Sequence, residues 1–564
     1  MEKRATSLFA NGEPMVWLTG GALAVATVMI AVLLGLVLVE GLPTFWPKPV
    51  VEVELSSGRK LAGEVAAEER FLPEPALLAA LPADQRAAAE QAIASEGGVR
   101  RRMLRTGNFE LSGTHFDWVS EHEIVRESTP EWLLVVERLS WGRFYGTPRA
   151  VTLAGVRTEG EPDKVWALAA EQHESVRQRW ERRRELETVA IGEVNREIEE
   201  ARLAAREIEL ESGVDSPAAK AAHAHAQEIA TGSDAEFREL QEQIAALRKE
   251  NAGYEVELET AGGTRTKLLL EEIVRATAPN HIGWSERVGV YFSRVAEFLL
   301  DDPREANSEG GVFPAIFGTV LMTLIMVLLV VPFGVLAALY LREYARPGPI
   351  VSAVRIAINN LAGVPSIVFG VFGLGFFCYI VGASVDELLF SAKLPTPTYG
   401  QGGLVWASLT LALLTLPVVI VPTEEALASV PGSMREGSYA CGATKWQTIW
   451  RIVLPRAMPG IMTGMILALA RGAGEVAPLM LVGAVKLAPE LPLDTTAPFL
   501  HAERSFMHLG FHIYDLGFQS QNSEAAKPMV FTTTLLLIAL VVLLNVLAIW
   551  IRARLRRRFQ GNTL

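Results

Sequence analysis

Cysteine is nearly absent from this sequence, which contains only Cys378 and Cys441 among 564 residues. Cys378 lies in an apolar run and Cys441 in a polar segment, so the sequence does not indicate a disulfide framework. Neither cysteine has metal-ligating residues beside it. We therefore expect both to be small, buried side chains.

Patterns that carry catalysis are also missing. No GxxxxGK[ST] sequence, the phosphate-binding loop of many ATPases, occurs in the chain. Serine, histidine and carboxylate residues are scattered without a triad-like context, so we do not expect an enzyme. The pairs His223/His225 and His508/His512, the second with i,i+4 spacing, have no cysteine or acidic cluster close by, and no metal site is expected.

Charge is unevenly distributed, although the formal total is −12. Acidic residues dominate the middle of the chain, whereas basic residues collect at its C-terminus. The acidic total argues against nucleic acid as a partner.

Long apolar runs are abundant. The first, Met15–Val39, is too long for the core of a signal peptide and has no small-residue cleavage pattern after it, so it predicts an uncleaved membrane span. Backbone groups in lipid must be paired internally, and barrel strands would alternate in polarity, so these runs predict helices. The five further predicted spans are Val312–Leu341, Ser352–Val381, Gly403–Val421, Pro459–Val485 and Pro528–Ile551.

The distribution of lysine and arginine predicts the orientation of these spans. Basic residues of the segments outside the lipid mark the cytoplasmic side. With six spans, four basic segments fall on one side, which places both termini in the cytoplasm and residues 41–311 outside. Their residues are Lys3, Arg4, Arg342, Arg346, Arg435, Lys445, Arg451, Arg456, Arg552, Arg554, Arg556, Arg557 and Arg558.

Residues 41–311 form a long insertion of soluble character between the first two spans. Val51–Val65 alternates polar and apolar residues around a Ser-Ser-Gly turn, and Tyr254–Ile273 repeats this layout around Ala-Gly-Gly, so both predict β-hairpins. Met103–Val125 and Trp132–Val151 are also typical of strands. The sequence therefore predicts a small β-domain assembled from both ends of the insertion.

The middle of the insertion is rich in helix-forming residues. Lys164–Ser212 and Pro217–Asn251 are separated by a break at Gly213, which predicts two helices in an antiparallel hairpin. A docking arm or spacer and a solvated insertion without a ligand are both open interpretations of this hairpin.

The segment 423–458 lies between the predicted fourth and fifth spans on the cytoplasmic side. Its spacing follows the "EAA" pattern of ABC importer permeases, in which a short helix, a glycine turn and a second short helix insert into a cleft of the ATPase. Glycine permits the tight turn, and a Leu-Pro pair is expected to end the second short helix before the fifth span. The residues of this predicted coupling loop are Glu436, Gly437, Ser438, Gly442, Ile452, Leu454 and Pro455.

Three segments resemble the PstA-type permease subunit of bacterial phosphate importers: Gly363–Gly370 (GVPSIVFG), Arg435–Trp446 (REGSYACGATKW) and Ala470–Leu479 (ARGAGEVAPL). The resemblance covers roughly residues 312–484. It does not cover the insertion, and residues 486–527 look expanded.

This resemblance implies an all-α polytopic membrane protein of the bacterial cytoplasmic (inner) membrane with the type I ABC importer permease fold. Residues 1–40 would hold the first span, 41–311 an extracytoplasmic α+β insertion, and 312–564 the five-helix permease core. It also implies a homologous permease, two ATPase subunits that bind ATP and Mg, and a phosphate-binding protein that delivers phosphate. No cofactor is expected in this chain.

Arg471 and Glu475 are the leading candidates for the substrate path. Charged residues inside a span are costly and usually face a partner or a water-filled path, and i,i+4 spacing puts both on one helix face. We expect Arg471 to offer its planar guanidinium to phosphate, with Glu475 as orienter or gate. A structural ion pair that fastens helices is the alternative.

Asn359, Asn360 and Ser366 are further candidates for lining the path. Polar side chains in spans also bond to neighbouring helices. Two other functions stay open at this point: import of another oxyanion such as sulfate, molybdate or phosphonate, and a membrane-anchored sensor or scaffold.

Overall fold

The computed structural model describes residues 13–304, 307–520 and 523–560. The chain divides into two compact units, each with its own buried core. The helical unit contains Met1–Phe45, Val312–Val385 and Thr398–Leu564. The insertion unit contains Trp46–Gly311 and Asp386–Pro397.

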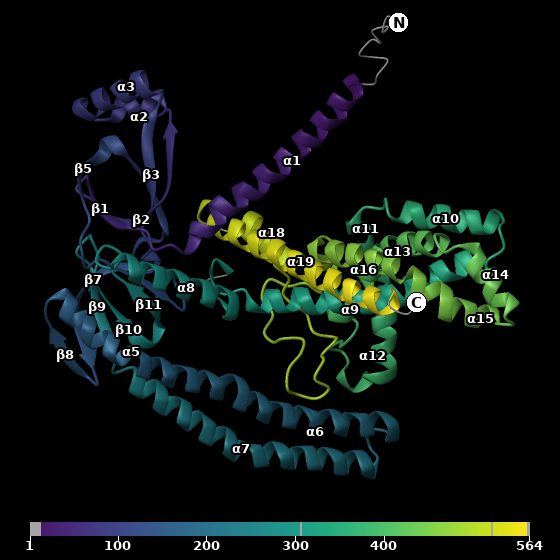
Figure 1. Cartoon of the computed structure of the whole chain (residues 1–564). Coiled ribbons are helices and arrows are strands. Elements are labelled where there is room, and N and C mark those ends of the chain that lie inside the picture. Colours follow the sequence, from purple (N-terminus) through teal and green to yellow (C-terminus); the bar gives the residue numbers. More distant parts are fainter. Residues whose placement is uncertain (1–12, 305–306, 521–522, 561–564) are drawn as a thin grey trace, which may run out of the picture. The chain divides into compact units, whose positions relative to one another are not determined.

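Six helices in the described part of the chain are long and apolar enough to cross a membrane: Met15–Phe45, Phe313–Tyr344, Ser366–Leu389, Leu404–Ala428, Lys445–Gly474 and Ala526–Arg554. With the sheet-containing insertion after the first of them, they confirm the predicted fold class. In Figure 1 they contain α1 (Glu13–Gly41), α9 (Phe313–Leu339), α11 (Ser366–Phe372) with α12 (Ala383–Leu389), α13 (Leu404–Ala428), α16 (Leu454–Gly474) and α19 (Ser523–Gln560).

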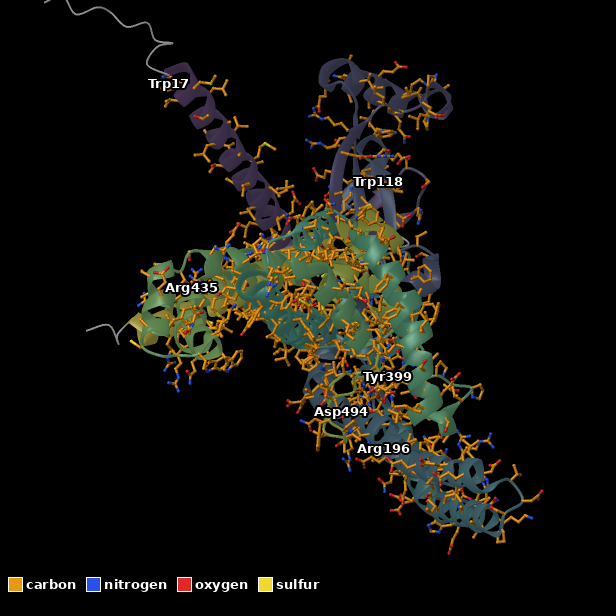
Figure 2. All side chains as sticks on the ribbon, turned by 90° about the vertical axis from the view of Figure 1, so that its right-hand side faces the viewer. Trp17, Trp118, Arg196, Tyr399, Arg435 and Asp494 are labelled. Atoms are coloured by element: carbon orange, nitrogen blue, oxygen red, sulfur yellow. The ribbon has the colours of Figure 1, made fainter. Side chains whose placement is uncertain are left out.

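Helix α1 has little protein around it. Only 6% of the most apolar 18-residue stretch of this span is buried inside the protein. Trp17, labelled in Figure 2, is 79% exposed. An apolar helix surrounded by water would be unfavourable, whereas lipid satisfies such a surface.

Helices α9, α13 and α16 form the centre of the helical unit. Met326 of α9, Leu411 of α13 and Ala468 of α16 are fully buried in one apolar cluster. Gly460 of α16 lies so close to Ala426 of α13 that an added Cβ would collide with the Ala426 side chain. The absence of a side chain at Gly460 thus sets how closely these two helices pack.

The predicted third span, Ser352–Val381, was wrong at its start. The structure contains a separate helix, α10 (Pro349–Leu361), a turn, and then α11 from Ser366. Pro365 explains the break, because the residue before a proline is disfavoured in the helical conformation. No residue of α10 is buried.

The predicted fifth span, Pro459–Val485, was wrong at both ends. One helix runs from Lys445 to Gly474, through α15 (Lys445–Thr448), a π-helical turn (Ile449–Val453) and α16. Leu454 and Pro455 therefore do not end a short helix. Pro455 lies inside this continuous helix, just after the π-helical turn, whose wider hydrogen-bonding pattern is a local irregularity of the helix. The helix ends near Gly472 and Gly474, which have low helix propensity, and α17 (Leu479–Val482) follows.

The insertion unit contains an antiparallel five-stranded sheet, a six-stranded sheet and a two-stranded pair, and both predicted hairpins are present. The first has the order β4-β3-β2-β1-β5 and comes entirely from the N-terminal part of the insertion. Its strands are β1 (Val50–Leu55), β2 (Lys60–Phe71), β3 (Val99–Arg105), β4 (Phe116–Ser120) and β5 (Ile124–Ser128).

The second sheet combines both ends of the insertion, as the sequence predicts. Its order is β10-β9-β7-β6-β11, with β8 paired to β7. Val136, Phe144 and Leu258 of this sheet pack against Val176 of α5. The elements are β6 (Leu134–Arg138), β7 (Phe144–Leu153), β8 (Val156–Glu159), β9 (Glu255–Glu259), β10 (Arg265–Leu269), β11 (Ile273–Thr277) and α5 (Pro162–Glu185).

The helical hairpin of the insertion is confirmed. Helix α5 continues through a π-helical turn (Leu186–Ala190) into α6 (Ile191–Ser212), and α7 (Pro217–Asn251) returns beside it (Figure 1). Gly213, at φ 89°, provides the reversal that a residue with a Cβ rarely adopts. The remaining elements are α2 (Pro75–Ala80), α3 (Ala83–Glu96), α4 (Phe109–Ser112), α8 (Trp284–Leu300), β12 (Pro303–Arg304) and β13 (Glu309–Gly310).

Candidate functional site

Arg471 and Glu475 contact each other at the end of α16. The Arg471 Nε lies 3.4 Å from the Glu475 Oε1, and the two side chains are 34% and 21% exposed. Glu475 has extended backbone angles and lies just beyond the helix, not on its face as the sequence suggested. Arg471 in the last helical turn also interacts favourably with the negative end of the helix dipole. The pair is thus partly accessible and fixed at a helix end.

Two of the segments that carry the family resemblance meet beside this pair. Gly370 of α11 packs against the backbone of Pro478, three residues after Glu475, so closely that an added Cβ would collide with it. Ser366 lies in the first turn of the same α11 and is half-buried. The structure therefore brings the GVPS and ARGAGE segments together, which the sequence alone did not predict.

Asn359 and Asn360 do not lie in a membrane-crossing helix. Both belong to α10, which the sequence placed in the third span. Asn359 lines a groove whose other walls come from α13 and from the π-helical turn that continues α9 (Tyr340–Tyr344), and Arg471 is not among the lining residues. The groove is lined by Arg342, Arg355, Ile358, Asn359, Ile420, Val421, Glu424, Glu425 and Ala428.

The predicted coupling loop contains a helix, a glycine turn and a second helix. The first helix is α14 (Gly432–Ala440), and Gly442 adopts φ 81° in the turn before α15. The Gly442 N–H donates to the Tyr439 carbonyl at 2.9 Å. Ser438 and Thr448 are joined by a hydroxyl hydrogen bond of 2.8 Å, which ties the two helices together. Their turn is exposed, including Cys441, which was expected to be buried.

Arg435 fastens this turn to the membrane-crossing helices. Its guanidinium pairs with Glu343 at 2.8 Å and donates to the carbonyls of Val430 and Leu427 at 2.6 and 2.9 Å. Glu343 belongs to the π-helical turn that continues α9, and Leu427 to α13. Figure 2 shows Arg435 within the helical unit. The sequence marked Arg435 only as a basic residue, and no local pattern reveals its distant partner.

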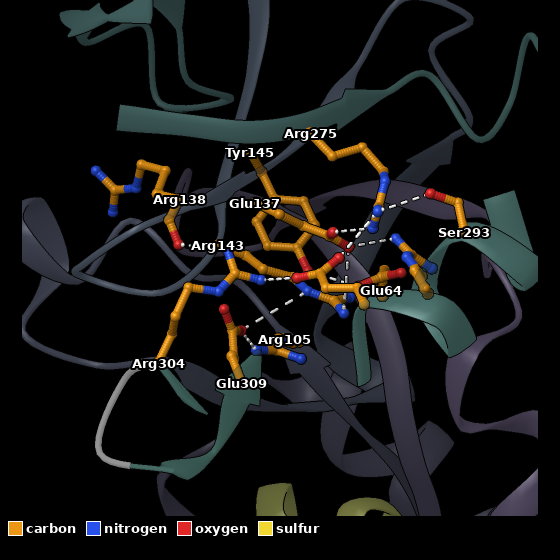
Figure 3. Close-up of polar contacts among 12 residues, drawn as sticks. Glu64, Arg105, Glu137, Arg138, Arg143, Tyr145, Arg275, Ser293, Arg304 and Glu309 are labelled. Atoms are coloured by element: carbon orange, nitrogen blue, oxygen red, sulfur yellow. Dashed lines mark hydrogen bonds and ion pairs between the residues drawn. The ribbon is translucent and has the colours of Figure 1, made fainter. Parts of the chain in front are cut away.

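A buried ionic network lies in the insertion unit (Figure 3). Glu137 pairs with Arg294 at 2.6 Å and with Arg275 at 2.8 Å, and Glu64 pairs with Arg143 at 2.6 Å. Burial would raise the pKa of Glu137, but the charges of Arg294, Arg143, Arg275 and Arg304 lower it to about 2. The network connects β2, β6, β7, β11 and α8, and the sequence analysis did not foresee it.

Some of the basic residues that predict the orientation lie outside the described part of the chain. Lys3 and Arg4 lie outside the described residues, as do the side chains of Arg556, Arg557 and Arg558. Within the described residues, no group of three or more histidine, cysteine or acidic side chains could hold a metal ion. His223 instead contacts Glu209 at 2.9 Å.

Residues 316–561 match the family model of the "Binding-protein-dependent transport system inner membrane component". The match covers the described helices from α9 to α19 and excludes the insertion.

Curated relatives resemble about a third of the chain. The phosphate transport system permease protein PstA of Mycobacterium leprae is 42% identical over 176 residues, which are 31% of this chain and 52% of that protein. The probable ABC transporter permease protein YqgH of Bacillus subtilis is 34% identical over 35% of this chain and 62% of its own length. The chain thus spans about half to three fifths of these relatives. The resemblance to PstA-type permeases is confirmed.

Solved structures with partial similarity to this chain include two ABC transporters. The MetNI methionine ABC transporter matches with a TM-score of 0.31 and 23% identity, over 43% of this chain and 94% of that one. A bacterial ABC transporter that imports alginate matches with a TM-score of 0.30 and 16% identity, over 50% of this chain and 85% of that one.

Proposed function

Because residues 316–561 form a domain of the family of binding-protein-dependent inner-membrane transport components, we propose that this chain is the membrane-spanning subunit of an ATP-driven importer of inorganic phosphate. It forms half of the translocation path and receives its driving force from a separate ATPase. The observation that carries the proposal is the exposed Gly442 turn, which Arg435 bonds to the ends of two membrane-crossing helices.

A motor outside the membrane moves helices only through a rigid connection. Arg435 supplies two such contacts, to Glu343 and Leu427, and the Ser438–Thr448 hydrogen bond holds the two helices of the turn at a fixed spacing. Charge-assisted hydrogen bonds of this kind are stronger than neutral ones. A push on the turn therefore reaches α9 and α13 directly.

Phosphate as the substrate is supported by the PstA relatives and by Arg471. The arginine is partly exposed, and its fork-shaped guanidinium matches a tetrahedral oxyanion. Glu475 would repel the anion, so its role is to orient Arg471 until substrate arrives.

The proposal includes the assembly and the orientation. A homologous permease, two ATPase subunits with ATP and Mg, and an extracytoplasmic phosphate-binding protein complete the transporter. Both termini and the Gly442 turn face the cytoplasm of a bacterium, and the insertion lies outside the inner membrane. Another oxyanion remains the competing substrate.

The role of Arg471 is tested by ATP-driven phosphate uptake into proteoliposomes that contain the assembled complex. Arg471→Lys keeps the charge but loses the fork, and we expect uptake to fall about tenfold, the effect of losing a charged hydrogen bond. Glu475→Gln should lower it less. Arg456→Lys, an exposed substitution on the same helix, is the matched control and should leave uptake unchanged. Normal uptake by both site variants, with assembly verified, would remove the proposed role of this pair.

A further inference from the structure

His512 is a buried imidazole that the proposed function does not yet use. It lies in α18 (Leu509–Tyr514) of the helical unit and is 2% exposed. Neither of its ring nitrogens has a hydrogen-bond partner among the described residues. Burying a polar group without a partner is costly, so such a group in a native structure calls for an explanation.

Contacts with α9 and α19 fix the position of the helix that carries His512. The Leu509 amide donates to the buried Thr319 hydroxyl of α9 at 2.9 Å, and the His512 amide donates to the His508 carbonyl at 2.8 Å. His508 is itself fully buried, and its Nδ1 accepts from the Gly510 amide at 3.1 Å. Helix α18, yellow in Figure 1, also packs against α19. The ring position is therefore fixed by the backbone and not by bonds to the ring.

The same helix contacts the segment that follows Arg471 and Glu475. Gly510, two residues before His512, packs against the Val476 side chain so closely that an added Cβ would lie 2.6 Å from the Val476 Cγ2. Val476 directly follows Glu475. The helix that carries His512 is therefore in contact with the side chain of the residue that directly follows the candidate anion-binding pair.

Charged groups near His512 come from two segments. Asp515 follows it by three residues, and the Lys486 Nζ lies 3.1 Å from the Asp515 Oδ2. These opposite charges compensate each other, and α9 contributes the hydroxyl of Thr319 and no charged side chain to this region. Burial then favours the neutral imidazole, which offers one N–H donor and one nitrogen acceptor.

We infer that His512 is a further binding residue of the anion path, and that it selects an oxyanion that still carries a proton. This inference rests on the proposed function. Hydrogen phosphate has oxygens that accept from the imidazole N–H and a P–OH that donates to its other nitrogen. Arsenate and phosphonates share this property, whereas sulfate and molybdate at neutral pH have no proton to donate. An unsatisfied acceptor disfavours an anion that lacks the donor.

The ring is closed off in this conformation. An anion reaches it only in a state in which α18 and the 475–478 segment have separated at the Gly510–Val476 contact. A transporter must open its path to each side of the membrane in turn. We therefore expect the Gly510–Val476 contact to open once in each transport cycle.

The test compares His512→Phe, His512→Leu and His512→Gln in the complete complex with its partner permease, ATPase and binding protein. We measure phosphate transported per ATP hydrolysed and the thermal stability of the complex. The two apolar variants should lose about tenfold or more of the phosphate moved per ATP, because they remove both hydrogen-bonding nitrogens. Their stability should be unchanged or higher, and glutamine should restore part of the transport because its amide has a donor and an acceptor.

Radiolabelled phosphate binding to the complex without the binding protein supplies the second readout. Arsenate should compete in the wild type and sulfate should not, and the apolar variants should lose the binding. Met507→Leu, a conservative change at a buried neighbour in the same segment, is the control and should behave as the wild type.

Three results would overturn the inference: wild-type transport by His512→Phe, failure of both apolar variants to assemble, or competition by sulfate equal to that by arsenate. A wild-type complex that moves no phosphate would instead refute the proposed function, and this inference with it. Normal wild-type uptake with insensitive His512 variants would refute the inference alone.

Discussion

Glu137 is the residue on which much of the buried charge of the insertion converges. It is 5% exposed and faces the guanidinium groups of Arg294, Arg275 and Arg143. Glu137 itself lies in β6, Arg275 in β11 and Arg294 in α8, so this carboxylate joins two strands and a helix. Removing one partner from such a pair leaves uncompensated buried charge, which costs more than the pair itself contributes.

Glu137→Gln is therefore expected to destabilise the insertion unit by about 3–5 kcal/mol, the typical cost of breaking a buried pair. Hydrogen exchange in the full chain measures this as faster exchange in β6, β11 and α8. The control is Glu127→Gln, which breaks a more exposed pair with Arg102 and should cost less than about 1 kcal/mol. Equal exchange in the two variants would contradict the role of Glu137.

The Glu137 carboxylate makes the stability of the insertion unit depend on pH. Because its pKa is lowered from 4.5 to about 2, its contribution to stability is fully present above pH 4.5. That contribution is lost as the pH falls through the range between these two values. The stabilising contribution of Glu137 is thus fully present across neutral pH.

The helix–turn–helix around Gly442 is the element that the sequence described best. Its helix, glycine turn and second helix were all predicted, since breakers and helix formers act locally. The sequence failed at the end of the second helix, because a π-helical turn at Ile449–Val453 lets the helix continue past Pro455. It also failed at Asn359 and Asn360, since hydropathy does not separate an exposed amphipathic helix from a span.

Gly442 provides the test at this scale. Alanine there must adopt φ 81°, which costs about 1–2 kcal/mol, and no atom lies near enough to add a steric clash. We expect Gly442→Ala to lower ATP-driven uptake while the complex still assembles.

The matched control is Gly432→Ala, at the first residue of α14. An added Cβ also meets no atom within 4 Å there, but the backbone does not require a positive φ, so alanine should stabilise the helix by up to about 1 kcal/mol. Uptake should stay normal in this variant. Equal losses in both variants would show that the turn geometry is not what matters.

At the scale of the molecule, different interactions stabilise the two units. The helical unit is held by apolar contacts and close glycine packing, which hydropathy and spacing predict well. The insertion unit depends on partners far apart in the chain, such as Arg183 and Glu271 at 2.9 Å, which no local pattern reveals. This difference explains why the span count was predicted correctly and the ionic network was not.

Two segments of the insertion that are far apart in the sequence lie next to each other. The Val50 amide donates to the Asn280 side chain at 3.1 Å, and that side chain donates back to the Val50 carbonyl at 2.8 Å. The family match begins at residue 316, after residues 41–311.

The most direct test of the central claim is phosphate uptake into proteoliposomes that contain this chain and its partner permease, with and without the separate ATPase. The account predicts ATP-dependent uptake when the ATPase is present, and none when it is omitted or when residues 441–444 are scrambled. Continued ATP-driven uptake without the ATPase, or with the scrambled turn, would contradict it.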